Sequence, residues 1–231
     1  MGALGQEKLR ACQGAADGGH VKDIVDDEDV ALRRAGEMPR AEAQAAREDA
    51  PVRTALARLM GVHTSERAWR LGAVGEVLVG AQLDKLTRED PRWHALHSIP
   101  VGARGSDIDH VVIGPGGVFT INTKHHPGSD IWVGGDAVLV NGVRHPYVRN
   151  SRHEADRAAR VLTAACGFDI SVTPLIVVVN AGQLTIKEGP IGVHILSRRR
   201  LRRWLRRRPD LLAATSEAIF EKARRSSTWT E

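Results

Sequence analysis

The sequence predicts an α/β protein in which helices cover a mixed β-sheet, and three observations support this. Small and apolar residues recur at helical spacing between residues 65 and 86. Two β-branched runs flank a Gly-Pro-Gly-Gly loop at 114–117, which indicates a β-hairpin. The almost wholly apolar segment 173–180 is typical of a strand covered on both faces. This alternation of helix and strand signals predicts a mixed sheet.

The composition limits the class of protein. A chain of 231 residues with 42% hydrophobic and 26% charged residues suits one domain with appendages, or one medium and one small domain. The two cysteines, Cys12 and Cys166, indicate reduced thiols rather than a disulfide framework. The longest apolar run, 175–179, is far shorter than the roughly 20 residues that span a bilayer. The first residues have neither the basic nor the apolar part of a signal peptide, so we expect a cytoplasmic protein without a membrane partner.

Residues 1–62 are expected to form a flexible, acidic and Ala-rich N-terminal arm. The segment 23–29 contains five acids, and residues 1–50 are poor in aromatics, so this part of the chain can bury little apolar surface. Residues 31–58 could form a fluctuating helix because they are rich in Ala, Glu and Arg. An alternative is that the acidic arm folds back on the basic C-terminal tail.

The first helix of the folded domain is expected to start at 64–66, where a hydroxyl cap precedes an acid, and to end near residue 86. Two glycines, Gly72 and Gly75, each cost a helix roughly 1 kcal/mol relative to alanine. They indicate that the helix is pressed close to another backbone. Glu76 lies on the small, apolar face, where an unpaired charge is costly. A structural salt bridge and a functional site are the two interpretations of Glu76.

The hairpin gathers polar side chains on one of its faces. With the loop at 114–117, antiparallel register places Asp109 opposite Asn122. The same register places Asp107 opposite Lys124. Directly opposed side chains lie roughly 4.5–5.5 Å apart at Cβ, and Asn122 and Lys124 share a face because side chains alternate along a strand. An acid, an amide oxygen and an ammonium group are sufficient to bind a divalent cation and to position a water beside a phosphate.

The rest of the chain carries further strand and helix signals. Asn141-Gly142 is typical of a type I′ hairpin turn. The predicted strands are 93–101, 130–133, 137–140, 143–145, 173–180 and 191–196, and the predicted helices are 150–166, 197–208 and one opening at Pro209.

Three segments carry a family resemblance, namely 72–76, 106–115 and 117–124. In this combination and order they resemble the nuclease-related domain (NERD) family, a branch of the PD-(D/E)xK restriction-endonuclease-like superfamily, over about residues 65–165. The resemblance implies a restriction-endonuclease-like α/β/α core built in the order helix, three strands, helix, strand. It also implies a nuclease that uses Mg²⁺ or Mn²⁺ to cleave DNA, with RNA as the alternative substrate.

By this resemblance, four residues occupy the functional positions of the family: Glu76, Asp109, Asn122 and Lys124. Asp109 is then the principal metal ligand, Glu76 reaches the metal from the first helix, and Asn122 offers its amide oxygen. Lys124 orients the attacking water and offsets charge that develops on phosphorus. The family usually carries a carboxylate where this chain has Asn122, so we expect weaker metal binding. Weak or selective cleavage and a non-cleaving nucleic-acid-binding module of the same fold are the alternatives.

Basic side chains near this site are candidates for contact with phosphate. We expect His125 and His126 to approach the substrate. In the segment 150–154 the family often carries Asn-Pro and then a glutamine, and this chain lacks both the proline and the glutamine. Arg152 could contact phosphate there, with an ordinary helix N-terminus as the alternative. A minor alternative is a transition-metal cluster of histidines, drawn from His110, His125, His126, His145 and His153.

A basic helical tail, 198–231, is expected after a nuclease-fold domain at 63–197. The tail holds eleven Lys and Arg against four acids, and eight of its arginines lie between 198 and 208. An apolar stripe at helical spacing there predicts an amphipathic helix docked on the domain. An arginine field of this density also attracts nucleic-acid phosphates. The tail residues expected to contact nucleic acid are Arg198, Arg199, Arg202, Arg203 and Arg206.

Overall fold

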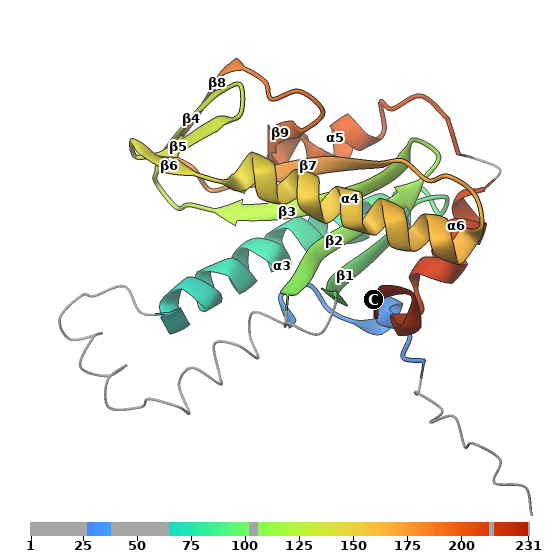
Figure 1. Cartoon of the computed structure of the whole chain (residues 1–231). Coiled ribbons are helices and arrows are strands. Elements are labelled where there is room, and N and C mark those ends of the chain that lie inside the picture. Colours follow the sequence, from blue (N-terminus) through green and yellow to red (C-terminus); the bar gives the residue numbers. More distant parts are fainter. Residues whose placement is uncertain (1–26, 38–64, 102–105, 213–214, 231) are drawn as a thin grey trace, which may run out of the picture.

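The structure is a computed structural model that describes residues 27–37, 65–101, 106–212 and 215–230. Its centre is a five-stranded mixed sheet in the order β1-β2-β3-β7-β9 (Figure 1). The first three strands are antiparallel, and β7 and β9 run parallel to β3. The α/β class and the mixed sheet are therefore confirmed. The strands are β1 (His94–Val101), β2 (Ser106–Gly114), β3 (Gly117–His125), β7 (Val172–Val179) and β9 (His194–Ser197).

Helices cover both faces of this sheet. The helix α3 (Ser65–Glu89) packs on one face, and α4 (Tyr147–Cys166) packs on the other (Figure 1). The order α3, β1–β3, α4, β7 is the predicted order of the core. Among the described helices, none has the length and apolar character that a membrane span needs.

The two faces of β3 belong to different cores, because successive side chains point to opposite sides of a sheet. Phe119 and Ile121 pack with Leu83 of α3. Val118 packs in the second core with Leu162 of α4. This alternation continues to the end of the strand, where Asn122 meets α4 and Thr123 meets α3. The direction of each polar side chain near the end of β3 thus follows from the burial of its apolar neighbours.

A second, smaller sheet extends from the end of β3, in the order β6-β5-β4-β8. Its buried side forms a third core with β7 and the start of α4. The strand β8 was not predicted, because its six residues carry only two apolar side chains and one of them, Ile186, is exposed. The strands are β4 (Asp130–Gly134), β5 (Ala137–Val140), β6 (Val143–His145) and β8 (Gln183–Glu188).

The acidic segment 27–37 packs on the C-terminal part of the chain, which is the alternative considered for the N-terminal arm. Asp29 forms an ion pair with Arg224 and a β-bridge with Arg225. Val30 is completely buried in the same core as Trp229. The flanking elements are η1 (Val30–Leu32), α6 (Ser216–Ala223) and η3 (Ser226–Trp229). The greater part of the helix expected over 31–58 lies outside the described residues.

Three details of the prediction are wrong. The helix expected over 197–208 is a 3₁₀ turn, η2 (Arg198–Arg200), followed by the short α5 (Leu201–Leu205). No helix opens at Pro209, because the chain instead turns to the hairpin loop, where two backbone N–H groups donate to the Pro115 carbonyl. A side chain at Gly72 would meet nothing within 4 Å, whereas at Gly75 it would lie 2.6 Å from the Cβ of His125. The close approach of α3 is therefore at Gly75.

Candidate active site

The strands β2 and β3 separate where the site begins. Their ladder runs from Gly114–Gly117, across a two-residue loop, to His110 opposite Ile121. The predicted register is correct over this length, but the expected pairs of Asp109 and Asp107 lie beyond the paired ladder. On its other side β2 pairs with β1, and that ladder also omits Asp109. Facing it, Ser98 has a φ of +48°, an irregularity at the point where the β1–β2 ladder is interrupted.

Asp109, released from both ladders, turns its carboxylate toward β3. Its Oδ2 accepts a hydrogen bond of 2.6 Å from the backbone N–H of Thr123. Burial raises the pKa of Asp109, and the nearby Lys124 ammonium opposes that rise. The carboxylate thus lies in the gap between the two diverging strands.

Glu76 reaches the same gap from α3. Gly75 allows this approach, because any larger residue would meet His125 and Thr123 of β3. Burial, followed by the charges of Asp109 and Asp107, raises the pKa of Glu76 to about 9, although the backbone N–H of Gly36 hydrogen-bonds to the carboxyl. Glu76 is 4% exposed, and its Oε2 has no hydrogen-bond partner. Glu76 is therefore an acid held neutral at pH 7 with one oxygen unsatisfied.

Asn122 and Glu154 join β3 to α4. The amide nitrogen of Asn122 donates to both carboxylate oxygens of Glu154, at 2.6 and 2.8 Å. Asn122 is 6% exposed, and its Oδ1 has no partner. Burial raises the pKa of Glu154 to about 7, with the Asn122 hydrogen bond opposing and the charge of Asp109 adding to the shift. Sequence reasoning missed Glu154 as a site residue. Its signal was its position three residues after Ser151 on the buried face of α4.

Lys124 brings a positive charge among these acids. It interacts electrostatically with Glu76, Asp109 and Glu154. Its ammonium lies 5.0 Å from the centre of the Tyr147 ring, in a cation–π arrangement. The structure thus brings together the four residues that the sequence singled out, and adds Glu154.

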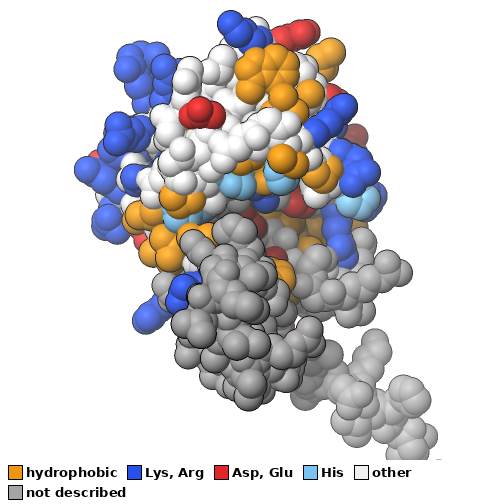
Figure 2. Space-filling view, turned by 90° about the vertical axis from the view of Figure 1, so that its left-hand side faces the viewer, with side chains coloured by type: hydrophobic (Ala, Val, Ile, Leu, Met, Phe, Trp, Pro, Cys, Tyr) orange, Lys and Arg blue, Asp and Glu red, His pale blue; other side chains and the backbone are white. Residues whose placement is uncertain are grey.

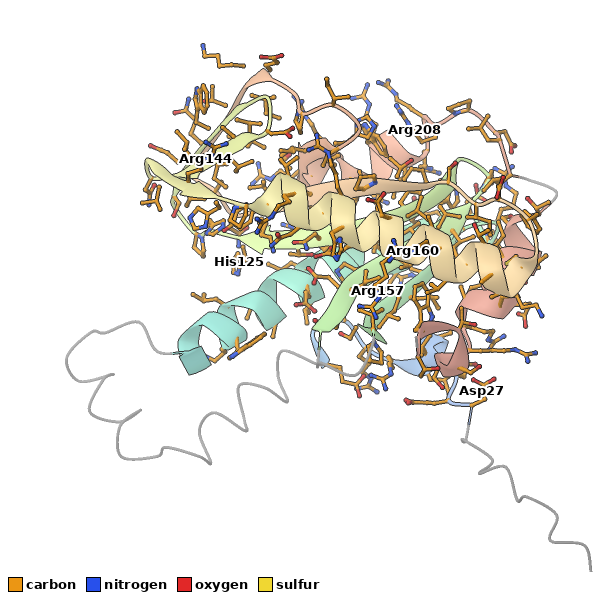
Figure 3. The ribbon with its side chains drawn as sticks, viewed as in Figure 1. Asp27, His125, Arg144, Arg157, Arg160 and Arg208 are labelled. Carbon is orange, nitrogen blue, oxygen red and sulfur yellow. The ribbon has the colours of Figure 1, made fainter. Side chains whose placement is uncertain are left out.

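An open groove of about 640 Å³ leads into this site between α4 and the start of β2. Asp107 and Glu154 line it together with arginines of α4. Figure 3 shows Arg157 between α4 and β2. The groove offers room for a polyanionic strand beside the acids. Its charged and polar lining comprises Asp107, Arg149, Asn150, Arg152, His153, Glu154, Asp156 and Arg157.

Histidine side chains gather near the end of β3, on the face that Figure 2 shows. The His125 Nδ1 donates to the carbonyl of Leu71 at 2.8 Å, and its Nε2 accepts from the Asn180 amide at 3.2 Å. His125 therefore ties α3 to β3. His126 hydrogen-bonds to the Tyr147 hydroxyl at 2.9 Å, and burial lowers its pKa.

The predicted basic residues fall in three places. Arg152 lines the groove and binds Asp136 and the Ile191 carbonyl. Arg198 and Arg199 directly follow Ser197, the last residue of β9. Ser197 is paired in register with Val178 of β7, which is in turn paired with Lys124 of β3. Two strand spacings, about 10 Å, therefore separate Ser197 from Lys124. Arg202 and Arg206 bind Glu89, which lies about 20 Å from Glu76 along α3. Arg203 is exposed on α5.

The donor set of the site fits a hard divalent cation. Asp109 and Glu76 offer carboxylate oxygens, and Asn122 offers an amide oxygen; two of these three groups have a buried, unpartnered oxygen. Mg²⁺ and Mn²⁺ prefer oxygen ligands, and Mg²⁺ commonly takes only one or two carboxylates. Among the described residues, no three His, Cys, Asp or Glu side chains are grouped closely enough to hold a metal. The alternative of a histidine cluster is therefore wrong, and His110 instead pairs with His97 at 2.8 Å.

Comparisons with known proteins point to one family. Residues 71–179 match the model of the nuclease-related domain family. An uncharacterized protein of Bacillus anthracis is 32% identical over 96 residues, which cover 37% of this chain and 43% of that relative. The chain thus spans less than half of the relative's length. No solved structure matches the chain.

Proposed function

Starting from the nuclease-related domain that residues 71–179 form, we propose that this protein cleaves phosphodiester bonds in DNA with the help of Mg²⁺ or Mn²⁺. One observation carries the proposal. Glu76, Asp109 and Lys124 come from three different elements and meet in the gap where β2 and β3 separate. Buried acids beside a lysine, next to an open groove, are costly for stability, and such costs are typical of active sites.

The residues divide the chemistry between them. Asp109, Glu76 and the Asn122 Oδ1 hold the cation, which when bound lowers the pKa of a water and polarises the phosphate. Lys124 orients the attacking water and offsets the negative charge that grows on the phosphate oxygens. Tyr147 keeps the Lys124 ammonium in place through its ring.

DNA is the proposed partner, held mainly through its phosphates. Arg149 and Arg157 of the groove bind the strand next to the cleaved bond. Arg198, Arg199 and Arg203 bind phosphates further along the DNA. Arg202 and Arg206, on the same segment, are held by their ion pairs with Glu89. His125 and His126 line the approach from the end of β3. Because these contacts are ionic, affinity falls steeply with salt.

A plasmid-nicking assay with Mg²⁺ or Mn²⁺ tests the cleavage. Lys124→Ala is expected to lower the rate at least about 100-fold, since it removes a group that stabilises the transition state. Lys187→Ala is the matched control, because Lys187 is an exposed lysine on β8 outside the site. Equal rates for Lys124→Ala and the unmodified protein would overturn the assignment.

A nucleic-acid-binding module that does not cleave is the second candidate function. The neutral Asn122 favours it, because the amide leaves β3 without a carboxylate two residues before Lys124. The two functions differ in metal binding. Calorimetric titration with Mn²⁺ gives a site that Asp109→Asn abolishes if the protein is a nuclease, and no such site if it only binds nucleic acid.

A further inference from the structure

We propose that the site takes DNA in which the base next to the phosphate at Lys124 is unpaired, and that this base stacks on a cluster of three rings. The ring cluster consists of His126, His145 and Tyr147. The inference rests on the proposed action on DNA and names the form of DNA that the site accepts. It is carried by the geometry of the rings and by their position next to Lys124 and the groove.

The three rings form one continuous surface. The His145 ring stacks on the Tyr147 ring, with centroids 4.8 Å apart and planes inclined by 23°, and the His126 ring lies 5.8 Å from Tyr147 at 25°. The two imidazole centroids are 6.2 Å from each other. Rings on opposite faces of Tyr147 would be at least about 7 Å apart, because each would lie roughly 3.5 Å from the phenol plane. The imidazoles therefore do not enclose the phenol ring between them.

The ring cluster is accessible from solvent. All three rings are half-buried rather than enclosed, and Pro146, between His145 and Tyr147, is exposed. Val143, two residues before His145 on the edge strand β6, is 62% exposed. Side chains two residues apart share a face of a strand, so Val143 extends the ring surface with an apolar one. A surface of this composition suits the flat, apolar face of a base better than it suits a phosphate.

Lys124 determines which part of the DNA meets the ring cluster. Its ammonium lies 5.0 Å from the centre of the Tyr147 ring, so a phosphate held by Lys124 has its neighbouring base within reach of the rings. The helix α4 starts at Tyr147 and lines the groove from Arg149 to Arg157. Arg149 follows Tyr147 by two residues, about 3 Å along the helix. A strand that lies in the groove and reaches Lys124 therefore brings a base to the ring cluster.

Stacking on the ring cluster requires an unpaired base. Within a duplex both faces of a base are covered by its neighbours, so a base reaches a protein ring only after it leaves the stack. Aromatic side chains, histidine included, are the groups on which proteins stack the bases of single strands. The arginines of the groove contact phosphates, which duplexes and single strands share. The ring cluster thus adds a preference that phosphate contacts cannot supply.

Fluorescence anisotropy with the full chain in EDTA tests the inference. The probes are a single strand of thymidines, an abasic strand of the same length, and the thymidine strand paired with its complement. The unmodified protein is expected to bind the thymidine strand at least about fivefold more tightly than the abasic strand, since only the former has bases to stack. His145→Ala should remove most of this difference and change the affinities for the abasic strand and the duplex by less than about twofold, because their phosphate contacts remain.

Two further variants make the result specific to stacking. His145→Phe keeps a ring and is expected to retain the preference for the thymidine strand, which a role of His145 in charge or in hydrogen bonding would not allow. His94→Ala is the matched control, because His94 is also a half-buried histidine stacked on an aromatic ring, that of Phe220 at 4.1 Å, and lies at the hairpin end of the sheet. It is expected to leave all three affinities unchanged. Thermal unfolding verifies that each variant is folded.

The outcomes separate this inference from the proposed function. Equal affinities for the thymidine and abasic strands would overturn stacking and leave cleavage, which the nicking assay measures, unaffected. A thymidine preference that survives His145→Ala, or a loss that is equal for all three probes, would also overturn the role of the ring cluster. A preference that depends on the ring at position 145, in a protein that nicks no plasmid, would support the inference and overturn the nuclease.

Discussion

At the scale of one residue, the buried Glu76 makes the free energy of unfolding depend on pH when no metal is bound. Its pKa rises from 4.5 to about 9, so between these pH values the folded protein keeps a proton that the unfolded chain releases. The free energy of unfolding therefore falls as pH rises from about 4.5 to about 9.

Glu76→Gln is expected to remove this pH dependence, because glutamine keeps the shape without the ionisation. The variant should gain on the order of 3 kcal/mol over the unmodified protein at pH 7 in the absence of metal, and more at pH 9. Urea unfolding at pH 5, 7 and 9 measures the gain. Parallel pH profiles for the two proteins would contradict a buried, neutral Glu76.

The sequence located single residues well where a strand pattern set their direction. Hairpin register and strand alternation singled out Asp109, Asn122 and Lys124. Glu76 lay on a defined helical face, and only the family resemblance made it a site candidate. Glu154 was missed because its importance depends on a contact 32 residues away along the chain. The release of Asp109 from both ladders was also unpredictable, since it depends on the irregularity at Ser98.

At the scale of elements, the segment 27–37 contacts β1 and α3 next to the site. Ser98 Oγ accepts a hydrogen bond from the Glu37 N–H and donates to the Arg34 carbonyl, both at 3.2 Å. Gly36 meanwhile hydrogen-bonds to Glu76. The sequence did not predict that this segment is ordered, because its composition is acidic. A single fully buried apolar side chain, Val30, anchors it in the first core.

Asp29→Ala is expected to loosen this segment. It removes the cap on the Ala31 N–H and the ion pair with Arg224, together roughly 1–2 kcal/mol of unfolding free energy at pH 7. Arg224 lowers the pKa of Asp29, so this stabilisation is present above about 3.8 and lost as pH falls below it. Urea unfolding at pH 7 and pH 3 tests both statements. Glu221→Ala, which removes the exposed acid on the other side of Arg224, should cost far less.

At the scale of the molecule, two basic surfaces stand at different distances from the acids. The arginines of α4 line the same groove as Glu154. Arg203 lies instead on α5 next to Arg202, which binds Glu89 at a point of α3 about 20 Å from Glu76. Arg149→Gln should therefore weaken binding and slow cleavage of short and long DNA alike. Arg203→Gln should weaken binding of long duplexes only, with each variant lowering the salt slope by about one. Gel shifts at several salt concentrations measure this, and equal losses on a short oligonucleotide would contradict it.

The first core also bears on how this protein can be cut down for study. Val30, Ile219 and Trp229 pack there with Ile99 and Leu162, although three of these five residues fall outside the family match at 71–179. A fragment trimmed to the matched borders would expose apolar surface and lose the backbone group that holds Glu76. Lack of activity in such a fragment would reflect damaged folding rather than absent chemistry. Protein expressed for an activity screen must therefore retain the residues on both sides of 71–179.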